Sequence, residues 1–134
     1  MATQSSKKYL NRLEKQLLKW KHADEVKFVR KIFAAEVDAG YIRVRIRLKN
    51  GDLLELSEYV TFHAGEIEII SYTYHWQDAY GRLKKRWDNA SYHSSAQSHP
   101  FHVHDGSEQN ILSSEPMTLR KILQSIEKEL KRSK

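Results

Sequence analysis

Hydrophobic and charged residues alternate strictly along residues 41–49, a pattern that predicts a β-strand with one buried face. The apolar positions are Ile42, Val44, Ile46 and Leu48, and the charged positions between them are Arg43, Arg45, Arg47 and Lys49. The basic side chains therefore share the face that points away from the core.

The dipeptide Asn-Gly that follows predicts the turn into the next strand. A two-residue turn would place Ile46 opposite Glu55 and mix apolar with charged residues. A three-residue loop with Gly51 in the left-handed region instead places Ile46 opposite Leu54, which keeps the apolar residues together. We therefore predict the three-residue loop, which also places Arg45 opposite Glu55.

Other segments with strand character are residues 26–38, 66–76 and 82–87. The first fits a strand or a helix, and we predict a strand. In the second, the alternation of apolar residues shifts at Ile69 and Ile70, which predicts a bulge that turns Tyr72, Tyr74 and Trp76 toward the core. Bulges often lie beside functional sites. His75 would then point to the face opposite the core. Residues 90–114 are rich in Ser and His, and we expect them to form a long ordered loop.

Amphipathic helices are predicted at both ends of the chain, where apolar residues recur at spacings of three and four. The buried stripes consist of Leu10, Leu13, Leu17 and Trp20 in the first helix and of Leu119, Ile122, Leu123, Ile126 and Leu130 in the second. Both stripes need an apolar partner, and the sheet supplies one. We predict an α+β fold with a single antiparallel sheet of four to five strands and the N- and C-terminal helices packed on one face. Residues 1–134 would form a single domain with an ordered core from about 6 to 130.

Composition narrows the classes of function. The 134 residues include no cysteine, which excludes disulfides, thiolate metal sites and cysteine nucleophiles. The N-terminus is polar and basic, and no segment approaches the length of a membrane span. We expect a cytoplasmic protein with no membrane contact.

The formal net charge of +6 is unevenly distributed. Residues 1–31 hold nine Lys and Arg against three acids, and residues 116–134 hold six against two, whereas residues 32–115 hold eight against twelve. Solvated helix surfaces explain this distribution as well as an RNA or acidic protein partner does.

Four of the seven histidines fall within residues 92–106. Lys and Arg are absent from residues 88–118, so this segment is better suited to proton transfer or metal binding than to simple phosphate binding. On an extended strand His102 and His104 would share one side, as two ligands of one metal ion or two proton carriers would.

A metal site would need at least a third ligand. The candidates are His75, His93, Asp88 and Asp105, and only the folding of the chain can bring one of them close. Asp88 also fits a second role, because with Asn89 it could cap the turn that leaves the strand 82–87. We therefore assign no metal and no other cofactor.

Histidines near arginines also suit metal-independent cleavage of RNA. A base removes the 2′-hydroxyl proton, an acid protonates the leaving 5′-oxygen, and a cation stabilises the phosphorane. Histidine suits both proton transfers because its ordinary pKa is near neutral. The catalytic candidates are His75, His93, His102 and His104, and the substrate-binding candidates are Arg43, Arg45, Arg47, Arg86 and Asp88. The alternative is that the arginines are merely solvated and the histidines only hold a loop in place.

The order and spacing of four motifs resemble the TumE family of small prokaryotic toxins. The motifs lie in residues 72–78, 86–90, 102–108 and 116–119, and the resemblance extends from about residue 41 to residue 126. It implies a toxin that is paired with a small antitoxin protein, and it implies no settled catalytic mechanism.

The family's histidine pattern is matched only in part. His93, His102 and His104 coincide with family histidines, whereas Tyr92 and Phe101 replace two others. Any shared chemistry is thereby narrowed to the three matching residues and His75.

Two classes of function follow. The first is a toxin that cleaves RNA with the loop histidines as acid and base. The second is a non-catalytic binding module for an antitoxin or a nucleic acid. A metal-dependent hydrolase is a further alternative, and the chain could form a homodimer.

Overall fold

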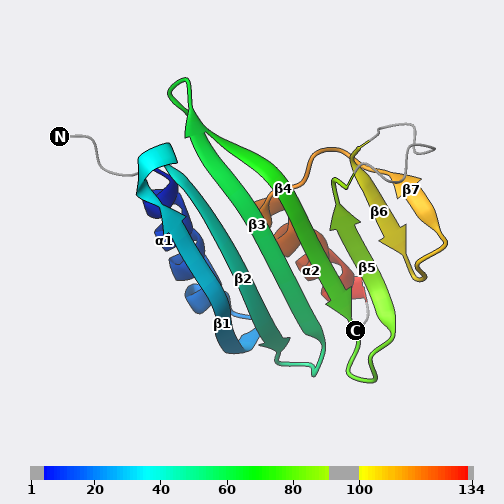
Figure 1. The fold of residues 1–134 in the computed structure, drawn as a ribbon. Coiled ribbons are helices and arrows are strands. Elements are labelled where there is room, and N and C mark those ends of the chain that lie inside the picture. Colours follow the sequence, from blue (N-terminus) through cyan, green and yellow to red (C-terminus); the bar gives the residue numbers. More distant parts are fainter. Residues whose placement is uncertain (1–4, 91–99, 133–134) are drawn as a thin grey trace.

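In a computed structural model that describes residues 5–90 and 100–132, one antiparallel sheet has both helices on the same face (Figure 1). The seven strands follow one another across the sheet in chain order. The elements are α1 (Ser5–Lys19), β1 (Ala23–Ala34), the 3-10 turn η1 (Ala35–Val37), β2 (Ala39–Leu48), β3 (Leu53–His63), β4 (Glu66–Gln77), β5 (Leu83–Asp88), β6 (His102–Asp105), β7 (Ile111–Ser113) and α2 (Leu119–Arg132).

The α+β class is confirmed, but the predicted number of strands is wrong. Within residues 5–90 and 100–132 the sheet has seven strands rather than four or five, because β6 and β7 lie in the segment that we expected to be a loop. These strands are only four and three residues long. In β6 the buried residues are the polar His102 and His104, whereas Val103 and Asp105 are half-buried. The strand therefore lacks the buried apolar residues by which a strand is recognised in a sequence.

The predicted β2–β3 hairpin is confirmed. Gly51 has a φ of 95°, in the left-handed region, and the loop closes with Ile46 opposite Leu54. Arg45 faces Glu55 in the same register. The register follows from the need to keep one face apolar, since a slip of one residue would move every side chain to the opposite face.

The bulge predicted in residues 66–76 is also present. Ser71 pairs with Tyr59 and Ile69 pairs with Val60, so Ile70 is the extra residue. Beyond it the core-facing residues are Tyr72, Tyr74 and Trp76, all buried. His75 lies between them in the sequence and points to the other face.

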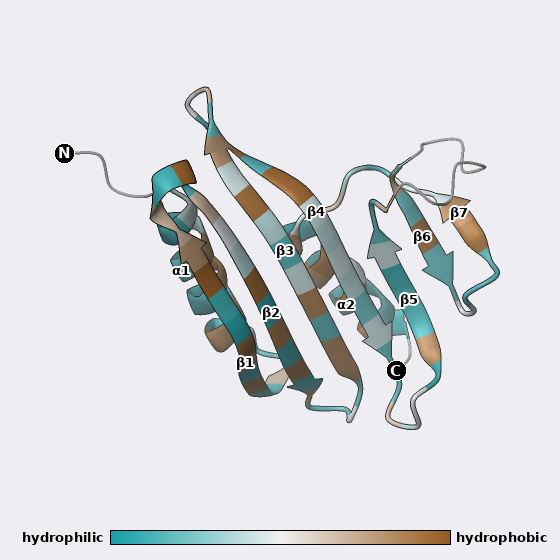
Figure 2. Ribbon diagram, in the orientation of Figure 1, coloured by the Kyte–Doolittle hydropathy of each residue, from teal (hydrophilic) through white to brown (hydrophobic). Residues whose placement is uncertain are grey.

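The core lies between the sheet and the two helices. The apolar stripes of α1 and α2 and the apolar faces of β2 to β5 form one continuous buried cluster. Figure 2 shows hydrophobic and hydrophilic bands alternating along β2 and β3, as a sheet covered on one side requires. The sheet face turned away from the helices, here called the open face, is the one that carries the arginines.

Glu58 is a charged residue within this core. Its carboxylate accepts hydrogen bonds of 2.6 Å from the hydroxyls of both Tyr9 and Tyr74. Burial raises the pKa of Glu58 more than these two hydrogen bonds lower it. Among the described residues, no helix is long and apolar enough to cross a membrane.

Candidate functional site

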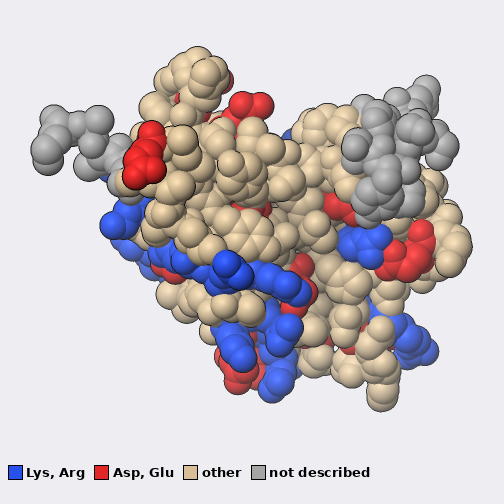
Figure 3. Space-filling model, in the orientation of Figure 1, with Lys and Arg blue, Asp and Glu red and all other residues tan. Residues whose placement is uncertain are grey.

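Side chains on the open face form rows that run across the strands, because paired residues of an antiparallel sheet project to the same side. The first row consists of Lys27, Arg45, Glu55, His75, Arg86 and His104. The second row consists of Arg30, Arg43, Ser57, Thr73, Asp88 and His102. Figure 3 views this face and shows Lys and Arg gathered over β1, β2 and β3.

The two rows end in a compact cluster where β5 pairs with β6. The cluster consists of Asp88, His102 and His104, and we call it the Asp88 centre. His102 Nε2 lies 2.8 Å from Asp88 Oδ1, and His104 Nε2 lies 3.8 Å from Asp88 Oδ2. The two imidazole rings meet edge to face with their centroids 5.0 Å apart. The β5–β6 register causes this arrangement, because it sets Asp88 directly opposite His102.

Backbone carbonyls fix the orientation of both imidazoles. His102 Nδ1 is 2.9 Å from the carbonyl oxygen of Pro100, and His104 Nδ1 is 2.8 Å from that of Glu108. A carbonyl oxygen only accepts hydrogen bonds, so each Nδ1 carries a proton and donates it. Both Nε2 atoms are therefore directed toward the Asp88 carboxylate.

Arg86 joins the Asp88 centre to the rest of the open face. Its guanidinium donates to Glu108 Oε1 at 2.7 Å and to His104 Nε2 at 3.1 Å, and its Nε lies 3.4 Å from Asp88 Oδ2. Because an arginine can only donate, His104 Nε2 accepts, which agrees with a neutral imidazole protonated at Nδ1. Glu108 was not among the residues selected from the sequence.

The Asp88 centre is buried although it belongs to the open face. The exposed fractions are 3% for Asp88, 0% for His102 and 1% for His104. A buried carboxylate requires a cation or several hydrogen bonds nearby. Here Asp88 also accepts a 3.0 Å hydrogen bond from the backbone N–H of Ala90, so the predicted turn cap and the histidine cluster use the same side chain.

His75 lies next to this centre in a surface depression of about 470 Å³. Arg45, Glu55 and Arg86 also line the depression. His75 faces Arg86 across the β4–β5 pair, and its Nε2 is 3.1 Å from Gln77 Oε1. Across the strands, this half-buried imidazole lies between Glu55 and Arg86, and Arg45 lies one strand beyond Glu55.

Arg43 and Arg45 both bind Glu55 on the neighbouring strand, at 2.8 and 2.9 Å. Burial raises the pKa of Glu55, but the bonds from the two arginines outweigh it and hold the pKa below its ordinary value. Arg47 follows on the same face, opposite Leu53. These arginines lie over β2, apart from the Asp88 centre.

The structure thus brings His102, His104, Asp88 and Arg86 together and sets His75 beside them. His93 lies outside the described residues. Sequence reasoning missed Lys27 and Arg30. Alternation in the β1 segment could have placed Lys27 on the basic face, but Arg30 reaches that face only through the register shift between Phe28 and Arg30.

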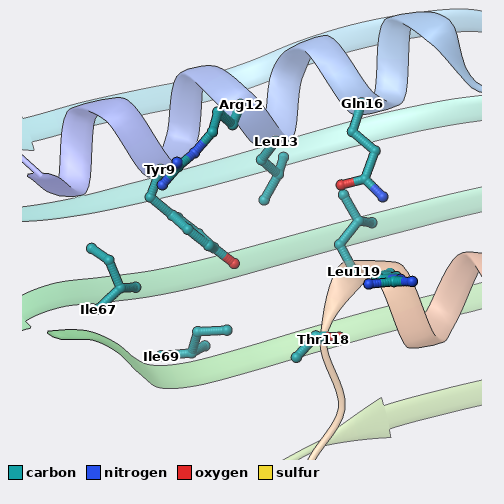
Figure 4. Close-up of a pocket in the computed structure, with 9 residues that line it drawn as sticks. Tyr9, Arg12, Leu13, Gln16, Ile67, Ile69, Thr118 and Leu119 are labelled. Carbon is teal, nitrogen blue, oxygen red and sulfur yellow. The ribbon is translucent and has the colours of Figure 1, made fainter.

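A separate groove of about 460 Å³ lies on the helix-covered side (Figure 4). It runs between α1 and the start of α2, and its apolar lining includes Leu13, Ile69 and Leu119. Arg12 and Arg120 line the same groove. The sheet separates this groove from the Asp88 centre.

Comparison with known proteins gives one match. The model of a protein family described as toxin TumE matches residues 14–133. No curated protein and no solved structure matches the chain. The matched range contains every strand of the sheet and the whole of the Asp88 centre.

Proposed function

The chain belongs to the toxin TumE family, and from that premise we propose that it is the toxin of a prokaryotic toxin–antitoxin pair and that it cleaves RNA on the open face of its sheet. The family accounts for the toxin role. The open face supports RNA as the target.

One observation carries the proposal. The first row begins with cationic side chains on β1 and β2 and ends where Arg86, His75 and His104 meet. Cationic side chains bind phosphates without regard to sequence, and they account for most non-specific affinity for nucleic acid. An RNA strand lying along this row would have one phosphate beside the histidines and further phosphates near Arg45, with Arg43 and Arg47 on either side of Arg45 along β2.

In this proposal each group has a role at the scissile phosphate. His104 Nε2, which accepts a hydrogen bond from Arg86 in the structure, would take the proton of the 2′-hydroxyl when Arg86 turns toward the phosphate. The 2′-oxygen then forms a bond to phosphorus while the bond to the 5′-oxygen breaks, and protonated His75 gives its proton to that oxygen. Arg86 stabilises the charge of the phosphorane. The products are a 2′,3′-cyclic phosphate and a 5′-hydroxyl.

His102 and Asp88 act as positioning groups in this scheme. Asp88 holds Arg86 through its Oδ2, and His102 packs edge to face against His104. His93 keeps the catalytic assignment that the sequence suggests for it, and no described residue bears on that assignment.

Growth arrest tests the proposal. The chain and its variants His75→Gln and His104→Gln are expressed from an inducible promoter, and circular dichroism shows whether each purified variant is folded. His63→Gln is the matched control, because His63 is an exposed histidine at the β3–β4 turn. We expect the control to arrest growth and both site variants to permit it. Arrest by folded site variants would instead indicate a non-catalytic binding module.

The expected partner is a small antitoxin, and the groove between the helices suits one of its segments. An acidic amphipathic segment would place apolar side chains on Leu13 and Leu119 and its carboxylates near Arg12 and Arg120. Co-expression of the product of the neighbouring gene tests this. Arg12→Glu combined with Arg120→Glu should abolish rescue of growth without reducing toxicity, and undiminished rescue would exclude the groove.

A further inference from the structure

We infer that the Asp88 centre is a binding site for a divalent transition-metal ion, with Asp88, His102 and His104 as its ligands. One carboxylate oxygen and one imidazole nitrogen from each histidine lie within 4.8 Å of one another. This inference goes beyond the proposed cleavage and stands whether or not the chain acts on RNA. If both hold, Asp88, His102 and His104 would hold the ion, and the ion would supply the base that the proposed cleavage assigns to His104.

The orientation of the imidazoles is the main support. Histidines that bind metals in proteins usually donate the other ring N–H to a backbone carbonyl or a carboxylate, which fixes the ring and the tautomer. His102 and His104 both do this through Nδ1, to Pro100 and Glu108. Their Nε2 atoms lie 2.8 and 3.8 Å from oxygens of the same carboxylate, that of Asp88.

The contact between His102 and Asp88 also supports a bound cation. With Nδ1 protonated, His102 Nε2 lies only 2.8 Å from a carboxylate oxygen. Two lone pairs at that distance repel each other unless a cation, either a proton or a metal ion, is bound there. A metal ion bound by both histidines would replace that proton on His102 and the hydrogen bond that Arg86 donates to His104 Nε2 at 3.1 Å.

The distances need only small adjustments. Zinc binds histidine nitrogens and carboxylate oxygens at about 2.0 to 2.2 Å, which separates neighbouring ligands of a tetrahedral ion by roughly 3.4 Å. His102 Nε2 lies 2.8 Å from Asp88 Oδ1, and His104 Nε2 lies 3.8 Å from Asp88 Oδ2. The three ligand atoms lie within 4.8 Å of one another, so each pair would have to move by about 1.4 Å or less to reach the tetrahedral separation.

The charge around the centre also favours a cation. Asp88 and Glu108 are two carboxylates, and both contact the single guanidinium of Arg86. A bound ion would neutralise Asp88 in place of Arg86, which would keep its closer contacts with Glu108 at 2.6 and 2.7 Å. Two imidazoles with one carboxylate favour zinc, iron, cobalt or nickel over magnesium, which prefers oxygen ligands.

Zinc titration of the tag-free, chelator-treated chain tests the inference. Calorimetry should show about one ion per chain, as three protein ligands on one ion require. Asp88→Asn should weaken zinc binding by at least about tenfold. His75→Gln is the matched control, since His75 lies on the same face but outside the centre, and it should bind zinc as the wild type does. Equal affinity in the wild type and in Asp88→Asn would overturn the inference.

Two further measurements test the site even if Asp88→Asn fails to fold. In the wild type, nitrogen NMR should show the Nε2 resonances of His102 and His104 shifting on addition of zinc, and unchanged resonances would count against the site. The chain has no cysteine, so His104→Cys introduces a unique thiolate, and cobalt should then give a sulfur-to-metal charge-transfer band. Zinc binding by a chain that leaves RNA intact would contradict the proposed function and not this inference.

Discussion

Arg45 lies opposite Glu55 across the β2–β3 hairpin, with its Nε and a terminal nitrogen 3.0 and 2.9 Å from the same carboxylate oxygen. Arg43 donates to the other oxygen of Glu55 at 2.8 Å. Both arginine side chains are 46% exposed, whereas the neighbouring Ile46 is completely buried. Consecutive residues of β2 therefore point in opposite directions, Ile46 into the core and Arg45 onto the open face.

This alternation predicts contrasting effects of two neighbouring substitutions. Ile46→Asp should destabilise the fold by several kcal/mol, because it places an unpaired carboxylate in the core. Arg45→Ala should cost less than about 1 kcal/mol, because an exposed ion pair contributes little. Urea melts monitored by circular dichroism measure both. Equal losses of stability would mean that the two faces of β2 are assigned incorrectly.

Glu55 also limits the affinity of the open face for RNA in our account. Its carboxylate holds Arg43 and Arg45, so Glu55→Gln should free both guanidiniums and remove a negative charge. We expect tighter binding of a single-stranded RNA and a steeper dependence of that binding on salt. Fluorescence anisotropy of a labelled RNA measures both quantities. Glu66→Gln, at an exposed acid where β4 begins, is the matched control, and an equal gain from it would show a general charge effect.

Glu58 predicts a specific dependence of stability on pH. Burial raises its pKa in the folded protein, so the folded state binds this proton more tightly than the unfolded chain does. The contribution of Glu58 to stability is therefore complete below the ordinary value of 4.5 and is lost as the pH rises through the higher folded-state pKa. Relative to Glu58→Gln, the wild-type free energy of unfolding should fall over that interval.

Denaturant melts of the wild type and Glu58→Gln at a series of pH values measure this difference. The contributions of other titrating groups to the pH dependence cancel when the two free energies of unfolding are subtracted, because the two proteins differ at one residue. A difference in stability that stays constant with pH would show that Glu58 has the same pKa in both states. Tyr9→Phe should shift the interval to higher pH, since the Tyr9 hydroxyl lowers the pKa of Glu58.

The sequence alone was sufficient for the parts of the fold that depend on one buried face. The register of Ile46 with Leu54 and the bulge at Ile70 both follow from keeping apolar residues on one side. The strands β6 and β7 were missed because they are short, and because His102 and His104 are buried polar residues.

The same limit applies to the candidate site. The spacing of His102 and His104 indicated two ligands or two proton carriers, but their relation to Asp88 depends on how β6 pairs with β5. Residues 89–101 separate β5 from β6 in the sequence, and no local pattern of residues predicts that the two strands pair. The contact between Glu108 and Arg86 depends on the same pairing, because Glu108 lies in the turn between β6 and β7 and Arg86 lies in β5.

The central claim, that the open face is the RNA-cleaving site of a toxin, is tested most directly by the chemical ends of RNA treated with the purified protein. We predict fragments with a 2′,3′-cyclic phosphate and a 5′-hydroxyl, produced by the wild type and His63→Gln but not by His75→Gln or His104→Gln. An RNA with a single 2′-deoxy nucleotide at the cleaved position should stay whole there, because the attacking hydroxyl is absent. Intact RNA after treatment with a folded wild-type protein that still arrests growth would contradict the claim.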